Sequence, residues 1–139
     1  FIRDANVVTV SIHADPNYFY PFYCGYGDEI GIEDGEGFNI NIPLMLGASE
    51  TMWLETLDKA IGHIRAFNVD VLIVGLGLDT YEHDPLGTFK VSKTGFGEAG
   101  MKIGRIELPI VLIQEGGYVS DGLTDNLAEF LINFQLVRG

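Results

Sequence analysis

The sequence is poor in cysteine, poor in basic residues and free of long apolar runs, and each shortage narrows the class of protein. Its one cysteine, Cys24, excludes a disulfide within the chain and predicts a free, packed thiol in a reducing, cytoplasmic setting. Only 8 Lys and Arg stand against 20 Asp and Glu, which argues against a nucleic-acid partner because phosphate binding needs clustered cations. No apolar run approaches the ~20 residues of a membrane span, so we expect no membrane partner.

What is present suffices for one folded domain. The chain has 139 residues, of which 47% are hydrophobic, and we predict a single domain over residues 1–139. The formal net charge of -12 would attract a cationic small molecule or a basic peptide. Solubility alone also accounts for such a charge, so the composition does not choose between these interpretations.

The segment from Val71 to Val74 is the centre of the predicted fold. It is short, apolar and rich in β-branched residues, which indicates a strand buried on both faces in a parallel sheet. Gly75 and Gly77 follow, and Asp79 stands at the carboxyl end. Since ligands of open α/β sheets bind beyond the carboxyl ends of the strands, Asp79 is a candidate functional residue. A capping or turn-forming role for Asp79 is the alternative.

The rest of the chain alternates between predicted strands and helices. Further strands are expected at residues 7–13, 38–43 and 110–113, and helices at 49–67, 95–106 and 123–136. Ser49 and Thr94 are the expected caps of the first two helices. Glycines weaken the second helix and would let it pack close to the sheet. This order predicts an α/β fold with a mostly parallel sheet and helices on both faces.

The strand at 110–113 ends in a second polar cluster that closes with Gly116, Gly117 and Tyr118. Right-handed crossovers place Asp79 and Tyr118 on the same edge of the sheet. A carboxylate there can bind a divalent metal, and a tyrosine hydroxyl can stabilise an oxyanion. A zinc site needs about three protein ligands, and the only other local candidate is His83.

An aromatic stretch, residues 18–23, holds five aromatic side chains around Pro21 and precedes an acidic loop at 25–37. Five aromatics on a loop cannot all be core residues, so some are expected to line a pocket wall. A plug of aromatic side chains beneath the loop is the alternative.

Five stretches together resemble the histone deacetylase / acetylpolyamine amidohydrolase family of the arginase/deacetylase superfamily. They are residues 9–16, 19–22, 35–43, 75–80 with 84–87, and 114–118, with the sequences TVSIHADP, FYPF, GEGFNINIP, GLGLDT with DPLG, and QEGGY. They follow the family's order over nearly the whole chain and are most similar to the acetylpolyamine amidohydrolases. The resemblance implies a partial arginase/deacetylase fold and zinc-dependent removal of acetyl groups from acetylated polyamines or acetyl-lysine-like amines.

The resemblance also implies roles for individual residues. Asp79 matches the third zinc ligand, and Tyr118 matches the tyrosine that stabilises the oxyanion. Tyr20 matches the aromatic wall of the substrate tunnel, where phenylalanine is usual, and Gly117 lies along the same tunnel. Two potassium sites are implied as well. The matching residues are Ser11 and Ile12 for the inner site and the main-chain oxygens of Phe1, Asp4, Val7 and Phe38 for the outer site.

Three expected parts of the family's site have no match here. The family's other two zinc ligands form an Asp-x-His pair, its general base comes from a His-His pair, and both precede the stretch that this chain matches. We therefore expect a C-terminal part of a longer deacetylase domain, inactive alone and partnered by the N-terminal part of the same protein. The alternative is a non-catalytic or partner-dependent ligand-binding fragment. The sequence leaves the oligomeric state open, a homodimer included.

Overall fold

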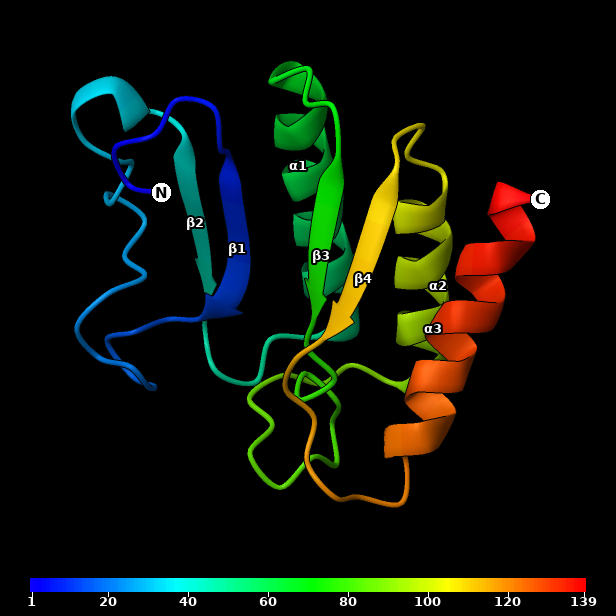
Figure 1. Cartoon of the computed structure of the whole chain (residues 1–139). Helices are drawn as coiled ribbons and strands as arrows, with labels where there is room; N and C mark the ends of the chain where they lie inside the picture. The colour runs from blue at the N-terminus through cyan, green and yellow to red at the C-terminus, as the bar shows by residue number, and fades with distance from the viewer. The chain divides into compact units, whose positions relative to one another are not determined.

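The computed structural model describes residues 1–139 and contains eight elements (Figure 1). Their bounds, in chain order, are β1 Thr9–Ala14, η1 Glu33–Gly35, β2 Asn39–Leu44, α1 Glu50–Ala66, β3 Leu72–Leu76, α2 Lys93–Gly104, β4 Ile110–Gln114 and α3 Leu123–Arg138. Every predicted strand and helix is present, with ends that differ by a few residues. None of the helices combines the length and the apolar character that crossing a membrane requires.

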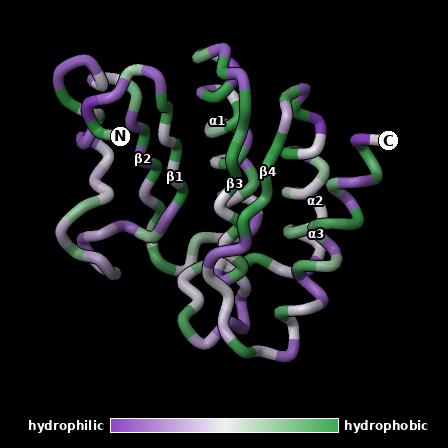
Figure 2. Tube along the Cα trace, viewed as in Figure 1, coloured by the Kyte–Doolittle hydropathy of each residue, from purple (hydrophilic) through white to green (hydrophobic).

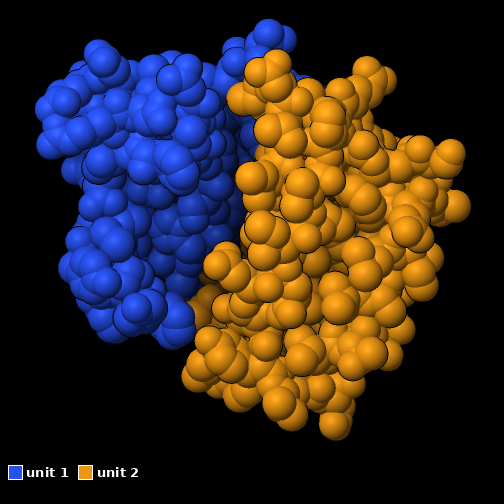
Figure 3. Space-filling view, viewed as in Figure 1, with its two compact units in different colours: residues 1–46, 56–68 blue, residues 47–55, 69–139 orange.

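The chain divides into two compact units, shown in Figure 3. Unit 1 comprises residues 1–46 and 56–68, and unit 2 comprises residues 47–55 and 69–139. The expectation of one domain over 1–139 stays a prediction. Each unit holds one pair of strands, and both pairs are parallel, as the α/β interpretation predicts.

Unit 1 is built on the parallel pair β1–β2, in which Thr9 lies opposite Asn39 and Ala14 opposite Leu44. The Thr9 hydroxyl donates to the Asn39 side-chain oxygen over 2.6 Å, which adds a side-chain bond to the ladder. Only Ala14 of β1 is buried. Cys24 is also exposed rather than packed.

Unit 2 is built on the parallel pair β3–β4, with Leu72 opposite Ile110 and Leu76 opposite Gln114. The prediction that β3 is buried on both faces is wrong. Alternate residues of the pair are open to solvent, with Ile73 63% and Val111 50% exposed. Figure 2 shows both strands as largely hydrophobic along their length. Their apolar side chains are those of a central strand, but within unit 2 each strand has one partner and one exposed face.

Helices α2 and α3 pack side by side in unit 2 (Figure 1). The glycines of α2 were expected to face the sheet, but three of them face α3. A Cβ on Gly100 would meet the backbone of Phe130, and one on Gly104 would lie 2.5 Å from the Val137 side chain. Glycine therefore sets the distance between the two helices, and Phe130 is fully buried beside them.

The caps of the helices are partly as predicted. The Ser49 hydroxyl accepts from the Met52 N–H over 3.3 Å at the start of α1, as expected. The cap of α2 is Ser92 rather than Thr94, because Ser92 is the last residue in extended conformation and its hydroxyl accepts from the Gly95 N–H. The Ser92 N–H in turn donates to Glu50 over 2.8 Å, which ties the first turn of α1 to α2 within unit 2.

Candidate active site at the ends of β3 and β4

The carboxyl ends of β3 and β4 lie side by side. The pairing continues past the strands, because the Glu115 N–H donates to the Leu76 oxygen over 3.0 Å and the Leu78 N–H to the Gly116 oxygen over 3.4 Å. The segments that carry Asp79 and Tyr118 therefore leave the same edge of one strand pair. The sequence-based prediction that the two segments meet there is confirmed.

The Asp79 carboxylate lies against two glycines. A Cβ on Gly116 would stand 2.8 Å from Asp79 Oδ2, and one on Gly77 would stand 2.8 Å from Asp79 Oδ1. Gly116 also has a φ of 73°, in the left-handed region that favours glycine. The space for the carboxylate at this strand end thus depends on the absence of both side chains.

The surroundings of Asp79 disfavour its charge. Burial raises the pKa of the Asp79 carboxyl above its usual value, and the negative charge of Asp84 raises the pKa further. A hydrogen bond from its own backbone N–H acts in the opposite direction. A cation bound at this carboxylate would lower the pKa again, since it would favour the charged form.

Tyr118 follows the two glycines at the end of β4. The residue is 47% exposed. Its backbone N–H donates to Asp84 Oδ2 over 2.8 Å. The position of this tyrosine is therefore set from the loop that follows Asp79.

Gly117 has a structural reason to be glycine. Its φ is 105°, and a Cβ would stand 2.8 Å from Leu78 Cβ and 2.9 Å from Leu123 Cδ1. The turn packs too closely for a side chain and needs a conformation that other residues rarely adopt. The role of Gly117 along a substrate tunnel stays a prediction beside this packing role.

The residues of this chain do not complete a zinc site. No group of three His, Cys, Asp or Glu side chains lies close enough to share a metal ion. His83, the second ligand considered from the sequence, is exposed and packs edge-on against the Tyr81 ring, with centroids 5.3 Å apart. Asp79 can supply one ligand where a catalytic zinc needs about three, so no step of a reaction is assigned to zinc here.

The aromatic stretch belongs to unit 1. Four of its five aromatic side chains are exposed, and Tyr20 is 70% exposed. The alternative of an aromatic plug beneath the loop is therefore wrong. Tyr20 belongs to unit 1 and the strand ends of β3 and β4 belong to unit 2, so the role of Tyr20 as the aromatic wall of a substrate tunnel stays a prediction.

The two residues predicted for an inner potassium site, Ser11 and Ile12, are neighbours on β1. The Ser11 hydroxyl pairs with His13 Nδ1 over 2.7 Å, and His13 Nε2 pairs with the Gly25 oxygen over 2.8 Å. His13 thus joins the strand to the following loop and has a structural role. Potassium binding at Ser11 and Ile12 stays a prediction.

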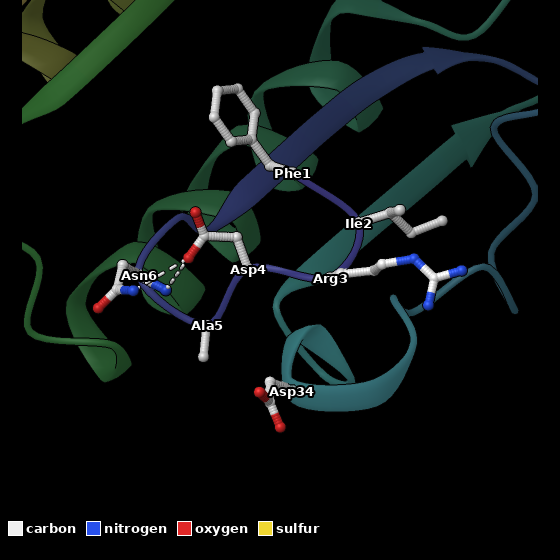
Figure 4. A pocket seen from close by; sticks show the side chains of 7 residues that line it. All are labelled: Phe1, Ile2, Arg3, Asp4, Ala5, Asn6 and Asp34. Atoms are coloured by element: carbon white, nitrogen blue, oxygen red, sulfur yellow. Dashed lines mark hydrogen bonds between the residues drawn. The ribbon is translucent and has the colours of Figure 1, made fainter.

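The outer potassium prediction concerns four main-chain oxygens of unit 1. Phe1 and Asp4 line one open pocket of about 540 Å³, with the Asp4 carboxylate turned back to Asn6 (Figure 4). Val7 and Phe38 are not among its lining residues. The oxygens of Phe1 and Phe38 already accept N–H bonds, of 2.8 and 2.9 Å, although a carbonyl retains a second lone pair. Backbone hydrogen bonds link three of the four residues, because the Asp4 N–H donates to the Phe1 oxygen and the Val7 N–H donates to the Asp4 oxygen over 3.4 Å. Potassium binding there stays a prediction.

Hydrogen bonding to Asn6 dominates the surroundings of the Asp4 side chain. The backbone N–H and the side-chain amide of Asn6 both donate to Asp4 Oδ1, over 2.9 and 3.0 Å. These two bonds lower the pKa of the Asp4 carboxyl. The bonded carboxylate stabilises this turn above the usual pKa of aspartate and stops doing so as the pH falls through the lowered value.

Sequence reasoning gave no role to Asp84, which the structure places between the loop after β3 and the segment after β4. It is buried, with 8% of its surface exposed, and its two carboxylate oxygens accept from different segments. The signal was present in the Asp84-Pro85 pair, because Asp before Pro commonly initiates a turn. The bond to Tyr118 joins residues 34 apart, which no local pattern reveals.

The histone deacetylase domain matches residues 1–133 of the chain. An acetylpolyamine amidohydrolase of Burkholderia pseudomallei is 41% identical over 139 residues, which are 100% of this chain and 41% of that protein. The Mycoplana ramosa acetylpolyamine amidohydrolase is 32% identical over 131 residues, which are 94% of this chain and 38% of that protein.

Solved structures of similar proteins also match the chain. The crystal structure of acetylpolyamine aminohydrolase from Burkholderia pseudomallei matches with a TM-score of 0.97 at 41% identity, covering 100% of this chain and 41% of that one. The structure of a histone deacetylase homologue complexed with SAHA matches with a TM-score of 0.85 at 30% identity. The match covers 99% of this chain and 37% of that one. The chain spans about two fifths of the length of these relatives. Over that length it has their fold, and it belongs to the histone deacetylase domain family.

Proposed function

We propose that the longer protein to which this chain corresponds hydrolyses N-acetyl amides, with acetylated polyamines as its substrates. The observation that carries the proposal is the pairing of β3 and β4, from which Asp79 and Tyr118 leave at one edge. The names of the acetylpolyamine amidohydrolase relatives support the choice of substrate. Acetyl-lysine-like amines are the second substrate class.

Within this proposal the two residues have different tasks. The hydroxyl of the exposed Tyr118 donates a hydrogen bond to the oxyanion that forms when the amide carbonyl is attacked. Asp79 would supply one carboxylate ligand to a zinc ion, whose other ligands would come from outside this chain. The 139 residues alone are therefore expected to be inactive and to bind zinc weakly. Potassium at the two sites in unit 1 belongs to the same proposal.

Charge favours a polyamine over a neutral substrate. The loop between Asp28 and Glu36 carries five acidic residues within a chain of formal net charge -12. Such a surface attracts a multiply charged cation and raises its local concentration at low salt. Tyr20, which is exposed in unit 1, would line the path of the substrate. The location of the protein is proposed to be cytoplasmic, on the grounds of its single, unpaired cysteine.

A second candidate is a non-catalytic or partner-dependent ligand-binding protein. The absence of any group of three metal-ligating side chains within this chain favours it. The two candidates differ in what the full-length polypeptide does, because only the first gains zinc and activity when the rest of the sequence is present.

The test compares acetate release from an acetylated polyamine and from an acetyl-lysine peptide, with full-length protein at matched concentration and low salt. Tyr118→Phe should keep zinc, and its rate should fall roughly 10²–10³-fold, since the substitution removes one oxyanion donor. Tyr26→Phe is the matched control, because it removes a hydroxyl bonded to the Phe22 oxygen in unit 1. Full activity of Tyr118→Phe would remove this tyrosine from the mechanism, and preference for the peptide would overturn the polyamine assignment.

A further inference from the structure

Asp84 makes more hydrogen bonds than a turn requires. Its Oδ1 accepts from the Leu86 N–H over 2.9 Å, which is an ordinary turn bond between residues i and i+2. Its Oδ2 accepts from the Tyr118 N–H over 2.8 Å. The first bond shapes the loop after β3, and the second joins this loop to the segment after β4.

The loop that carries Asp84 is held by its own backbone hydrogen bonds. The Asp84 N–H donates to the Tyr81 oxygen over 3.1 Å, and the Gly87 N–H donates to the Asp84 oxygen over 2.9 Å. A Cβ on Gly87 would stand 2.6 Å from the Tyr81 oxygen and 3.2 Å from the Asp79 oxygen, so the turn closes tightly on its own start. Asp84 is therefore fixed relative to the backbone of Asp79.

The segment that Asp84 holds is otherwise anchored through the Gly116 oxygen, which accepts from the Leu78 N–H over 3.4 Å and from the Gln114 side-chain amide over 2.7 Å. Gly116 and Gly117 both have positive φ, at 73° and 105°, and glycine is the residue with the widest choice of backbone conformations. The Tyr118 N–H is the first backbone donor after them. A bond at this point limits how far the two glycines can swing the tyrosine.

We infer that Asp84 is a positioning residue, which holds the backbone of Tyr118 at a fixed place beside Asp79. The inference rests on the proposed function only for its consequence, which is a correctly placed oxyanion donor. The contact itself does not depend on the reaction. A hydroxyl that must meet an oxyanion at hydrogen-bond distance loses its effect when its backbone moves by about 1 Å.

Asp84→Asn separates the two bonds. Its remaining Oδ1 keeps the local bond to Leu86, which asparagine makes as readily as aspartate. Its amide group then faces the Tyr118 N–H, where a donor meets a donor. Asp84→Ser is the second variant, because the short hydroxyl side chain can still bond locally but cannot reach Tyr118. The matched control is Asp15→Asn, since Asp15 accepts only through Oδ1, from the N–H and the amide of Asn17.

The experiment measures backbone hydrogen exchange in the full-length protein, followed by kinetics. Exchange at Tyr118 should rise about tenfold or more in both Asp84 variants and stay unchanged in Asp15→Asn. In acetate release, Asp84→Asn should lower kcat about tenfold, with a smaller change in KM. In a Tyr118→Phe background it should have little further effect, because it acts through that hydroxyl.

Each outcome decides one question. Unchanged exchange at Tyr118 in Asp84→Asn and Asp84→Ser would overturn the inference, as would a loss of rate that is fully additive with Tyr118→Phe. Raised exchange at Tyr118 in a parent protein that releases no acetate would support the contact and overturn the proposed function instead.

Discussion

Gly116 offers a test of how the strand ends hold Asp79. In Gly116→Ala the new methyl would stand 2.8, 2.9 and 3.0 Å from three atoms of the Asp79 carboxylate, whereas ordinary contact begins at 3.4 Å. The carboxylate must therefore move by about 0.5 Å, which exceeds the ~0.2 Å tolerance of a metal–ligand distance. The variant also pays about 1–2 kcal/mol for a non-glycine residue in the left-handed region.

Gly47→Ala is the control that isolates the contact from the backbone strain. Gly47 has a φ of 77°, close to the 73° of Gly116, but its Cβ would meet only the end of the Lys90 side chain, at 3.9 Å. Both variants should lose about 1–2 kcal/mol for the backbone conformation, and Gly116→Ala should lose about 1 kcal/mol more from overpacking.

Urea unfolding of the full-length protein measures the stability of each variant, and zinc content and acetate release measure the site. Gly116→Ala should lose zinc and activity, while Gly47→Ala should keep both. Equal zinc content in the two variants would refute the argument that Gly116 makes room for the Asp79 carboxylate. Equal losses of stability in the two variants would show that the positive φ, rather than the contact with Asp79, dominates.

Three further outcomes are expected. Gly100→Ala should destabilise by about 1–3 kcal/mol because its methyl meets the backbone of α3, whereas Gly62→Ala, with nothing within 4 Å, should stabilise by about 0.5–1 kcal/mol in thermal unfolding. Asp79→Asn should make the metal-free protein more stable at neutral pH. The raised pKa means that ionisation weakens the fold as the pH rises above 3.8, so the advantage should vanish below that pH in unfolding curves. Ser92→Ala should cost about 1 kcal/mol and Thr94→Ala much less, since only Ser92 caps α2; equal costs would contradict the assigned cap.

The sequence by itself determined the elements and the two strand ends. Alternation between short β-branched runs and helical spacing is a local property, so β3, β4 and the three helices were predicted close to their observed bounds. Parallel pairing follows from the helix between consecutive strands, and it brought Asp79 and Tyr118 to one edge without any structure. The resemblance to deacetylases added the role of each residue, which the physical pattern alone left open.

Only the tertiary structure decided the contacts between distant segments. The glycines of α2 were known from the sequence, but whether they face a sheet or α3 depends on the position of a helix some 30 residues away. The exposure of Ile73 likewise depends on what covers the strand and not on its composition. Asp84 shows the limit most clearly: a local pattern predicts its turn, whereas its bond to Tyr118 exists only because two strand ends meet in space.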